Sequence, residues 1–463
     1  MKHPLVGQGL GDRFQVVPFR ATNPVVGELP GSKSLTNRAL LVAAMCEGPV
    51  RLEGILLSED TEILIECLGV LGCRVEVDRA GETCLVHGNR LQHAGEVDLY
   101  VGNAGTVARF LPGALAVCGR GAYRFDGTEA MRKRPISGLV AALESLGASV
   151  DWLGEVGHFP LLLRSKPVEL GLWGVDASQS SQILSSLLLS APMAGRPITI
   201  NLLKETVSRP FVEMTLRLMR AFGATVSSDQ SGQNFEVDAK AYEVPEGGSF
   251  KIEPDATAAS YFFALPVAVG GRIRLEGLVQ NGWQGDLRFT EVLQDLGMNL
   301  QWKGSSVECW ANWGDAGIGG KTERHYDFNA FSDTFLTLAA VAPLLPFPVS
   351  IEGIAHTRAQ ECDRIEAMAA GLRRLNQGVE ETEDSLRILP SREGLEEAAR
   401  RGVEIETYRD HRVAMSFAVL GSADLLGDSK PWMTILNPRC VEKTFPDFFL
   451  RLAKYCNGAL GLK

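Results

Sequence analysis

The segment Leu143-Glu144-Ser145-Leu146-Gly147-Ala148-Ser149-Val150 contains the pattern on which the fold depends. Apolar residues with helical spacing lead to a Leu-Gly pair, and a β-branched residue follows shortly after it. Glycine at the end of an amphipathic helix adopts the left-handed conformation that ends the helix, and valine is typical of a strand. The segment therefore predicts a helix that turns directly into a strand.

The same ending recurs along the chain. Copies of it lie at 67–75, 218–226 and 292–300, and a weaker copy, with Asn376 in the place of the glycine, lies at 371–376. The capping glycines are Gly72, Gly147, Gly223 and Gly297, at intervals of 75, 76 and 74 residues. A near-constant period of this length indicates a repeated structural unit.

Each copy also contains a second helix that begins with small and hydroxyl-bearing residues. These helices are predicted at 34–45, 106–117, 180–191, 257–269, 334–342 and 413–420. Six of them in 463 residues give about 77 residues per unit, which matches the glycine spacing. The predicted fold class is α/β, with six βαβαββ repeats divided equally between two similar domains.

Composition narrows the classes of function. The hydrophobic fraction is 45% and the charged fraction 22%, as in average globular proteins. Acidic residues outnumber basic ones by 56 to 46, so the net charge is −10. This charge disfavours a general nucleic-acid or anionic-membrane surface. Any anion must therefore bind to a local cluster of bases.

Localisation and redox state follow from two absences in the sequence. No stretch of about 18 apolar residues and no signal-peptide core is found, which predicts a cytoplasmic protein. The nine cysteines contain no CxxC pair. They are therefore interpreted as packing thiols, and neither a zinc site nor a disulfide framework is expected.

Three segments combine small residues with the start of an apolar helix. In 29–38, a Gly-Ser turn precedes Lys33 and Arg38, and free backbone N–H groups at a helix start favour an anion. Segments 102–109 and 176–182 have a similar construction, with Gly105 in one and three serines in the other. Ordinary helix caps with solvated bases would explain any one of them.

Bases also gather in four other polar segments, at 132–135, 361–364, 410–412 and 442–446. A surface ion pair would account for each segment taken alone. Their joint occurrence in an acidic protein favours a site for a small polyanion.

Together these motifs resemble those of the 5-enolpyruvylshikimate-3-phosphate (EPSP) synthases. The segments PGSKS, GNAGT, RPI, SSQ, DHRVAM and KTFPD occur in the family's order between Pro30 and Phe449. The resemblance implies the enolpyruvyl transferase fold, an inside-out α/β barrel with two domains of three repeats. It assigns residues 1–30 and 254–463 to the first domain and residues 31–253 to the second, with the active site in the cleft between them.

The resemblance also implies a reaction. The enolpyruvyl group of phosphoenolpyruvate is transferred to the 5-hydroxyl of shikimate 3-phosphate by addition and elimination, with release of phosphate. The reaction belongs to the shikimate pathway, which leads to chorismate and the aromatic amino acids. The family resemblance implies a cytoplasmic monomer that needs no cofactor or metal and is a glyphosate target.

Site residues are carried over from the family motifs. The catalytic residues would be Lys33, Asp333, Glu361 and His411, with Asp333 as general base, Glu361 as proton donor and His411 orienting the phosphate. The shikimate 3-phosphate site would contain Lys33, Ser34, Arg38, Ser180, Ser181, Gln182, Ser208, Asp333, His356 and Gln360. The phosphoenolpyruvate site would contain Lys33, Gly105, Arg134, Gln182, Arg364, Arg412 and Lys443.

Three positions depart from the family pattern. His356 and Gln360 stand where the family often has an Asn and a Lys, and Phe110 stands where many bacterial members have Pro. Gln360 lacks the positive charge of the family's Lys. The acceptor substrate is therefore either shikimate 3-phosphate or a related compound. Two alternatives remain: an enolpyruvyl transferase acting on UDP-N-acetylglucosamine, and a non-catalytic anion-binding homologue. The loop before Arg134 contains Glu129 but not the Cys usual in the first of these.

Overall fold

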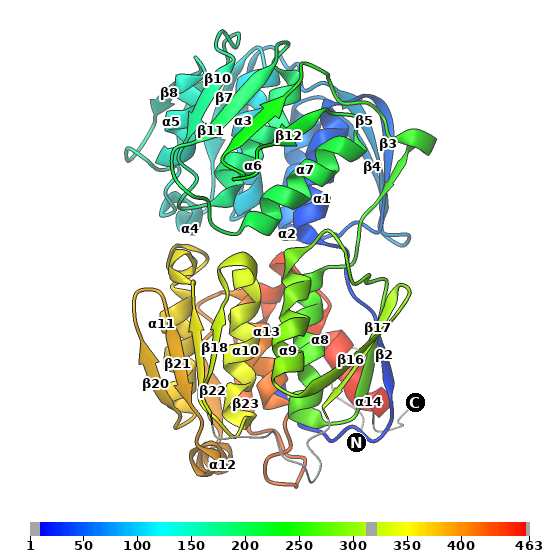
Figure 1. Cartoon of the computed structure of the whole chain (residues 1–463), viewed down its shortest axis with the longest axis vertical. Helices are drawn as coiled ribbons and strands as arrows, with labels where there is room; N and C mark the ends of the chain where they lie inside the picture. Colours follow the sequence, from blue (N-terminus) through cyan, green and yellow to red (C-terminus); the bar gives the residue numbers. More distant parts are fainter. Residues whose placement is uncertain (1–9, 312–321, 460–463) are drawn as a thin grey trace. The chain divides into compact units, whose positions relative to one another are not determined.

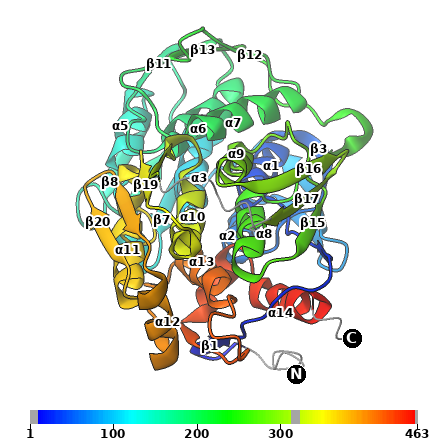
Figure 2. The same ribbon diagram turned by 60° about the horizontal axis from the view of Figure 1, so that its bottom comes forward.

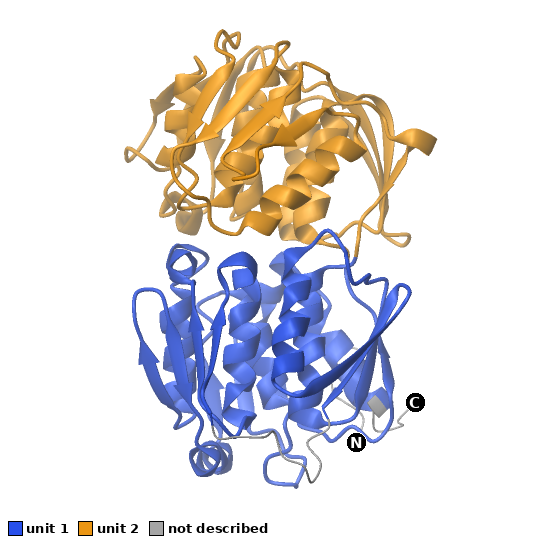
Figure 3. Cartoon of the chain, in the orientation of Figure 1, with its two compact units in different colours: residues 1–30, 254–463 blue, residues 31–253 orange. Residues whose placement is uncertain are grey.

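The chain is described by a computed structural model that covers residues 10–311 and 322–459 (Figure 1). It forms two compact units (Figure 3). Unit 1 is Met1–Pro30 with Pro254–Lys463, and unit 2 is Gly31–Glu253. Each unit is considered by itself below.

Unit 2 contains three four-stranded sheets and the helices that connect their strands. The elements, with 3₁₀ helices marked η, are α1 Lys33–Met45, β3 Glu47–Glu53, α2 Glu59–Val70, β4 Arg74–Asp78, β5 Thr83–Asn89, β6 Glu96–Tyr100, α3 Gly105–Cys118, β7 Ala122–Asp126, α4 Glu129–Arg132, α5 Ser137–Ser145, β8 Ser149–Trp152, β9 Leu161–Arg164, β10 Leu172–Val175, α6 Ser181–Ser190, η1 Ala191–Met193, β11 Ile198–Leu202, α7 Arg209–Ala221, β12 Val226–Ser228, β13 Asn234–Val237, η2 Glu246–Gly248 and β14 Ser249–Lys251. The strand orders are β14-β3-β5-β4, β6-β7-β9-β8 and β10-β11-β13-β12.

Unit 1 contains two four-stranded sheets and one three-stranded sheet. Its elements are β1 Arg13–Val16, β2 Val25–Gly27, α8 Ala256–Val269, β15 Arg272–Glu276, η3 Gly285–Arg288, α9 Phe289–Asp295, β16 Met298–Lys303, β17 Ser306–Ala311, β18 Arg324–Asp327, η4 Asn329–Thr334, α10 Phe335–Val341, η5 Ala342–Leu344, β19 Val349–Glu352, η6 Ala355–Ala359, α11 Arg364–Arg374, β20 Gly378–Glu381, β21 Leu386–Leu389, α12 Arg392–Arg401, β22 Val403–Ile405, α13 His411–Gly421, β23 Met433–Leu436, η7 Pro438–Lys443 and α14 Phe448–Ala459. The strand orders are β2-β15-β17-β16, β18-β19-β21-β20 and β1-β23-β22.

The repeat predicted from the glycine spacing is visible in the strand directions. In each four-stranded sheet the first two strands run parallel and the other two neighbouring pairs run antiparallel. The sixth sheet is shorter: β22 and β23 are parallel, and β1 pairs antiparallel with β23. The described strands therefore form six separate repeats of an α/β fold rather than one closed barrel of strands.

The capping residues have the conformation that the sequence predicts. Gly72, Gly147, Gly223 and Gly297 have φ angles of +79°, +99°, +81° and +90°, and Asn376 has a φ of +56°. These angles lie in the left-handed region, which Gly adopts without strain and Asn tolerates. The helix-to-strand turns of the repeat are confirmed.

Helices occupy the interior of each unit. All eleven residues of α13 are buried, as are eleven consecutive residues of α1, from Leu35 to Met45. Helices buried on every side belong in a core rather than on a surface. In unit 1, α8, α10 and α13 pack against one another, and in unit 2, α1, α3, α6 and α7 do so. Figure 2 shows α8, α10 and α13 between the sheets of unit 1, and in unit 2 the helix α7 has an exposed face, since only six of its thirteen residues are buried.

One predicted helix is shorter than expected. The segment predicted as 334–342 is a seven-residue α10 between two 3₁₀ helices, η4 and η5. Pro343 contributes to this shortening because it lies at the second position of η5 and donates no backbone hydrogen bond.

None of the helices in the described ranges combines the length and low polarity needed to cross a membrane. All nine cysteines are unpaired, and seven of them are buried. These seven fit the interpretation as packing thiols, whereas Cys362 and Cys440 are partly buried.

Candidate active site

The N-terminal ends of four helices meet at one end of unit 2. Arg38 of α1 donates hydrogen bonds to Thr215 Oγ1 of α7 at 2.8 Å and to Ser185 Oγ of α6 at 3.3 Å. Asn37 of α1 donates to Thr106 Oγ1 of α3 at 3.0 Å. All five residues lie within the first two turns of their helices. The partial positive charges of these helix starts favour a bound anion.

Most residues predicted for unit 2 lie on these helix starts. Lys33 and Ser34 begin α1, Gly105 begins α3, and Ser180 caps α6 by accepting a hydrogen bond from the backbone N–H of Gln182 at 3.3 Å. Ser181 is the first residue of α6, and Ser208 is the N-cap residue of α7. The structure thus collects the residues predicted from separate motifs.

Arg38 is a buried cation that interacts with neutral groups. The residue is 1% exposed, and no carboxylate of the described chain lies within ion-pair distance of it. Burial lowers the pKa of its guanidinium to about 9. The guanidinium carbon lies 4.9 Å from the centre of the Phe110 ring, a stacking contact that favours the charged form. Phe110, whose role the sequence does not reveal, therefore stabilises the charged guanidinium of Arg38.

Two guanidinium groups border Gly105. A β-carbon at this position would lie 3.0 Å from Nη2 of Arg134 and 3.4 Å from Nη1 of Arg109. Nε and Nη1 of Arg134 are buried without a hydrogen-bond partner in the described part of the chain. Buried donors without acceptors are costly, and an anion at Gly105 would supply the acceptors.

Lys33 has a carboxylate partner that the sequence analysis does not identify. Its Nζ lies 3.3 Å from Oδ2 of Asp60, a residue that is 1% exposed in the first turn of α2. The other oxygen, Oδ1, is buried without a hydrogen-bond partner among the described residues. Asp60 resembles an ordinary acidic residue at a helix start, so its sequence position gives no signal of this contact.

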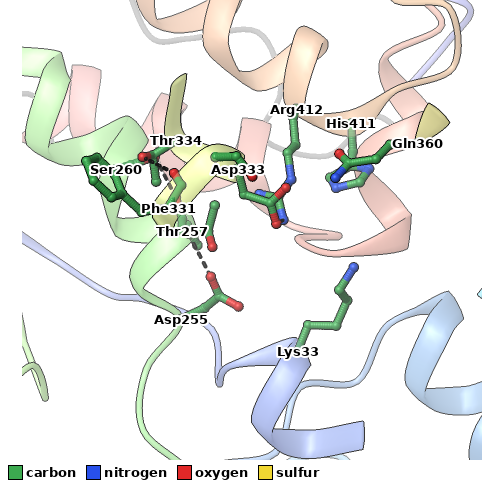
Figure 4. Close-up of polar contacts among 12 residues, drawn as sticks. Lys33, Asp255, Thr257, Ser260, Phe331, Asp333, Thr334, Gln360, His411 and Arg412 are labelled. Atoms are coloured by element: carbon green, nitrogen blue, oxygen red, sulfur yellow. Dashed lines mark hydrogen bonds and ion pairs between the residues drawn. The ribbon is translucent and has the colours of Figure 1, made fainter. Parts of the chain in front are cut away.

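Unit 1 gathers helix starts in the same way. The hydroxyls of Ser260 in α8 and Thr337 in α10 lie 2.9 Å apart. Arg364, the first residue of α11, and Arg412, the second of α13, both donate to Asp333 of η4. Figure 4 shows the Asp333 carboxylate against Arg412. The predicted catalytic carboxylate therefore lies where four helices begin.

Arg364 is the centre of an ionic network. Its donors contact Asp333 Oδ1 at 2.8 Å, Glu361 Oε2 at 2.8 Å and Asp410 Oδ2 at 2.7 Å. The residue is 1% exposed. Burial opposes the charged form, but the carboxylates of Asp410, Glu361 and Asp333 outweigh burial and hold the pKa of Arg364 well above its ordinary value. Arg364 is a fixed cation.

Each of the two predicted catalytic carboxylates also contacts a second cation. Asp333 Oδ2 accepts a hydrogen bond from Nη2 of Arg412 at 2.6 Å, and Glu361 Oε1 accepts one from Nζ of Lys443 at 2.6 Å. Burial opposes the charge of Arg412, but Asp333 contributes to a pKa above the ordinary value. The three predicted cations thus meet both carboxylates within one cluster, which we call the Arg364 cluster.

His356 and Gln360, two of the three residues that depart from the family pattern, also lie at the Arg364 cluster, as does His411. His356 Nε2 lies 2.8 Å from Ser332 Oγ, and burial lowers the pKa of the imidazole, which favours the neutral ring. The side-chain oxygen of Gln360 accepts a hydrogen bond from Arg364. His411 is fully buried at the start of α13. All residues predicted for unit 1 are therefore brought together.

Two carboxyl groups of this cluster were not singled out from the sequence. Asp410 is fully buried, caps α13 by accepting from the Arg412 backbone N–H at 2.7 Å, and pairs with Arg364. Asp286 of η3 is 4% exposed. Burial, with the nearby charge of Asp333, raises its pKa to about 7. Only tertiary contacts distinguish these aspartates from ordinary acidic residues at helix starts. Asp410 does stand in the DHRVAM motif, but the motif alone does not show that it pairs with Arg364.

The described residues do not contain a group of three or more His, Cys, Asp or Glu side chains arranged to hold a metal ion.

Comparisons with known proteins agree on one family. The model of the EPSP synthase (3-phosphoshikimate 1-carboxyvinyltransferase) family matches residues 20–452. A 3-phosphoshikimate 1-carboxyvinyltransferase from Opitutus terrae is 46% identical over 450 residues, which cover 96% of this chain and 97% of that protein. One from Nostoc punctiforme is 39% identical over 432 residues, 92% of this chain and 94% of that protein.

Solved structures share the fold. An EPSP synthase from Acinetobacter baumannii superimposes with a TM-score of 0.72 at 22% identity, over 96% of this chain and 98% of that one. The enolpyruvyl transferase NikO from Streptomyces tendae gives a TM-score of 0.70 at 15% identity, with the same coverage of 96% and 98%. With the family match over nearly the whole length, these findings show that the chain belongs to the EPSP synthase family.

Proposed function

We propose that this chain transfers the enolpyruvyl group of phosphoenolpyruvate to the 5-hydroxyl of shikimate 3-phosphate, releasing phosphate. The observation that carries the proposal is the Arg364 cluster, in which three cations meet the two carboxylates that the reaction needs. Phosphoenolpyruvate is a small anion with a carboxylate and a phosphate, which guanidinium groups bind through paired hydrogen bonds. The names and high identity of the relatives support the same substrates.

The addition step needs two proton transfers that the cluster can supply, and the elimination step needs a third. Asp333 accepts the proton of the attacking hydroxyl, whose oxygen bonds to C2 of phosphoenolpyruvate. Glu361 delivers a proton to the methylene carbon, C3. Glu361, now a carboxylate, takes back a proton from C3 as phosphate leaves C2, which restores the double bond. Lys443, which contacts Glu361 at 2.6 Å, would stabilise the carboxylate that remains after the transfer.

Unit 2 supplies the remaining contacts in this proposal. Arg134, whose buried donors lack partners among the described residues, binds phosphoenolpyruvate beside Gly105. Lys33, Ser34, Arg38 and the serines at the starts of α6 and α7 bind shikimate 3-phosphate, with Gln182 against both substrates. His356 and Gln360 of unit 1 act as neutral hydrogen-bonding groups for the sugar-like ring. The chain needs no cofactor and acts as a cytoplasmic monomer, the oligomeric state being testable by light scattering.

The direct test measures phosphate release from phosphoenolpyruvate by the purified chain. We expect release with shikimate 3-phosphate and none with UDP-N-acetylglucosamine. Release with the second acceptor alone would replace the proposal with the peptidoglycan reaction. A folded chain that binds both substrates but releases nothing would be an anion-binding homologue.

Glyphosate should inhibit the reaction in competition with phosphoenolpyruvate, because Gly105 leaves space beside Arg134. In Gly105→Ala the new β-carbon would lie 3.0 Å from the Arg134 guanidinium, so this group must move. We expect the variant to lose glyphosate affinity by at least about tenfold and to bind phosphoenolpyruvate more weakly as well. Inhibition kinetics on both proteins measure this.

Gly69→Ala is the matched control, since nothing lies within 4 Å of the position that its β-carbon would take. Equal glyphosate inhibition of the wild type and Gly105→Ala would show that this glycine does not border the phosphoenolpyruvate site.

A further inference from the structure

The Arg364 cluster contains more carboxyl groups than cations. The cations are Arg364, Arg412 and Lys443. The carboxyl groups are Asp286, Asp333, Glu361 and Asp410, and the charge of Asp255 acts on both Asp286 and Arg412. An entering anion adds negative charge to a region that is already acidic. In the proposed function Lys33 and Arg134 offset part of the charge of this anion, and protonation of a carboxyl group in the cluster offsets a further part.

Asp286 has no ion-pair partner within the described part of the cluster. Its Oδ1 is buried and has no hydrogen-bond partner among the described residues. The groups that face it are Asp333 of η4, Arg412 of α13, and Asp255 and Thr257 at the start of α8. By contrast, Asp333 contacts two guanidinium groups and Asp410 contacts one. Asp286 Oδ1 therefore lacks the ion pairs that hold the carboxylates of these two neighbours.

An anion that binds to Arg364 and Arg412 competes with Asp333 for the same donors. Asp333 and Asp286 then become two enclosed carboxyl groups with weaker cationic support. Two such groups share a proton, because the free energy of ionising both of them at close range is unfavourable. The reaction nevertheless needs Asp333 in its ionised form, to accept the proton of the hydroxyl.

We propose that Asp286 takes up a proton from solvent as phosphoenolpyruvate binds to Arg364 and Arg412, and thereby keeps Asp333 ionised as the base. Asp286 is a positioning residue, since it acts through Asp333. The inference rests on the proposed function. Burial and the charge of Asp333 already raise the pKa of Asp286 to about 7, so a bound anion moves a group that is close to protonation at neutral pH.

The test is calorimetry of phosphoenolpyruvate binding to the full chain, without shikimate 3-phosphate so that nothing turns over. At pH 7.5, the heat in buffers of different ionisation enthalpy gives the number of protons taken up. We expect the wild type to take up roughly half a proton or more beyond Asp286→Asn. The phosphate of the ligand, with a pKa of about 6, contributes equally to both proteins.

Asp295→Asn is the matched control. It removes the same charge from the neighbouring helix α9, where Asp295 is half-exposed and bonded to Tyr326. Its proton count should equal that of the wild type. Equal counts for the wild type and Asp286→Asn would overturn the inference.

Thr257→Val is a second variant for the same calorimetric test, and it is used if Asp286→Asn does not fold. The Thr257 hydroxyl favours the ionised form of Asp286. Its loss should move the pH range of proton uptake upwards, and an unchanged range would contradict the inference. Failure of the proposed function is separate: it would appear as no phosphate release and no saturable binding, whereas failure of this inference alone leaves turnover intact.

Discussion

Arg364→Met should lower kcat/KM by at least about 10³ and the free energy of unfolding by about 3–5 kcal/mol. Met replaces much of the aliphatic stem, so the main change is loss of the guanidinium. The fully buried Asp410 and the nearly buried Glu361 would then lose a shared cation. Uncompensated buried charges account for the loss of stability, and a missing anion contact for the loss of activity.

Denaturant unfolding and phosphate release measure the two effects. Arg373→Met on the same helix is the control, because Arg373 pairs with Glu381 while its side chain is 48% exposed. An exposed pair contributes about 1 kcal/mol or less, so this variant should remain close to the wild type. Equal unfolding free energies for both variants would show that the Arg364 cluster is not a structural element of unit 1.

Asp333→Asn and Glu361→Gln should each lower turnover by about 10²–10⁴ while substrate binding is retained. Both substitutions keep the shape of the side chain and remove its capacity to exchange protons. Each also removes a negative charge that competes with a bound anion for Arg364. We therefore expect the affinity for phosphoenolpyruvate to be unchanged or higher.

Calorimetry and single-turnover phosphate release separate these two effects. Glu366→Gln, an exposed change in the first turn of α11, should leave both quantities unchanged. Loss of phosphoenolpyruvate binding in both test variants would contradict the proposed roles, since it would make the carboxylates binding groups rather than proton carriers.

The repeat was predictable because one local device, a glycine-capped helix followed by a strand, recurs at a nearly constant interval. Gly72 and Gly147 have the left-handed conformation that this device requires. The short sixth sheet was not predictable, because its third strand, β1, comes from the other end of the chain. Local pattern contains no information about such a distant partner.

Part of the candidate site could likewise be predicted from the sequence, and part of it could not. Lys33, Arg364 and Arg412 stand in recognisable motifs at helix starts, so the residue types and their order were sufficient to predict them as site residues. Asp60 and Asp286 stand where acidic residues are common, and only tertiary contacts with Lys33 and Asp333 distinguish them. Chemistry that depends on burial is therefore the part that sequence alone does not reveal.

The pairing of β2 with β15 has a consequence for how the protein is made. Val25–Gly27 is synthesised about 245 residues before Arg272–Glu276, the strand beside it. The intervening Gly31–Glu253 forms a complete unit of consecutive chain, so it can fold on the ribosome. During this time β2 has no partner, because β15 has not yet been synthesised. Unit 1 is therefore completed last, and a ribosome stalled near residue 300 would carry one folded half and one unfinished half.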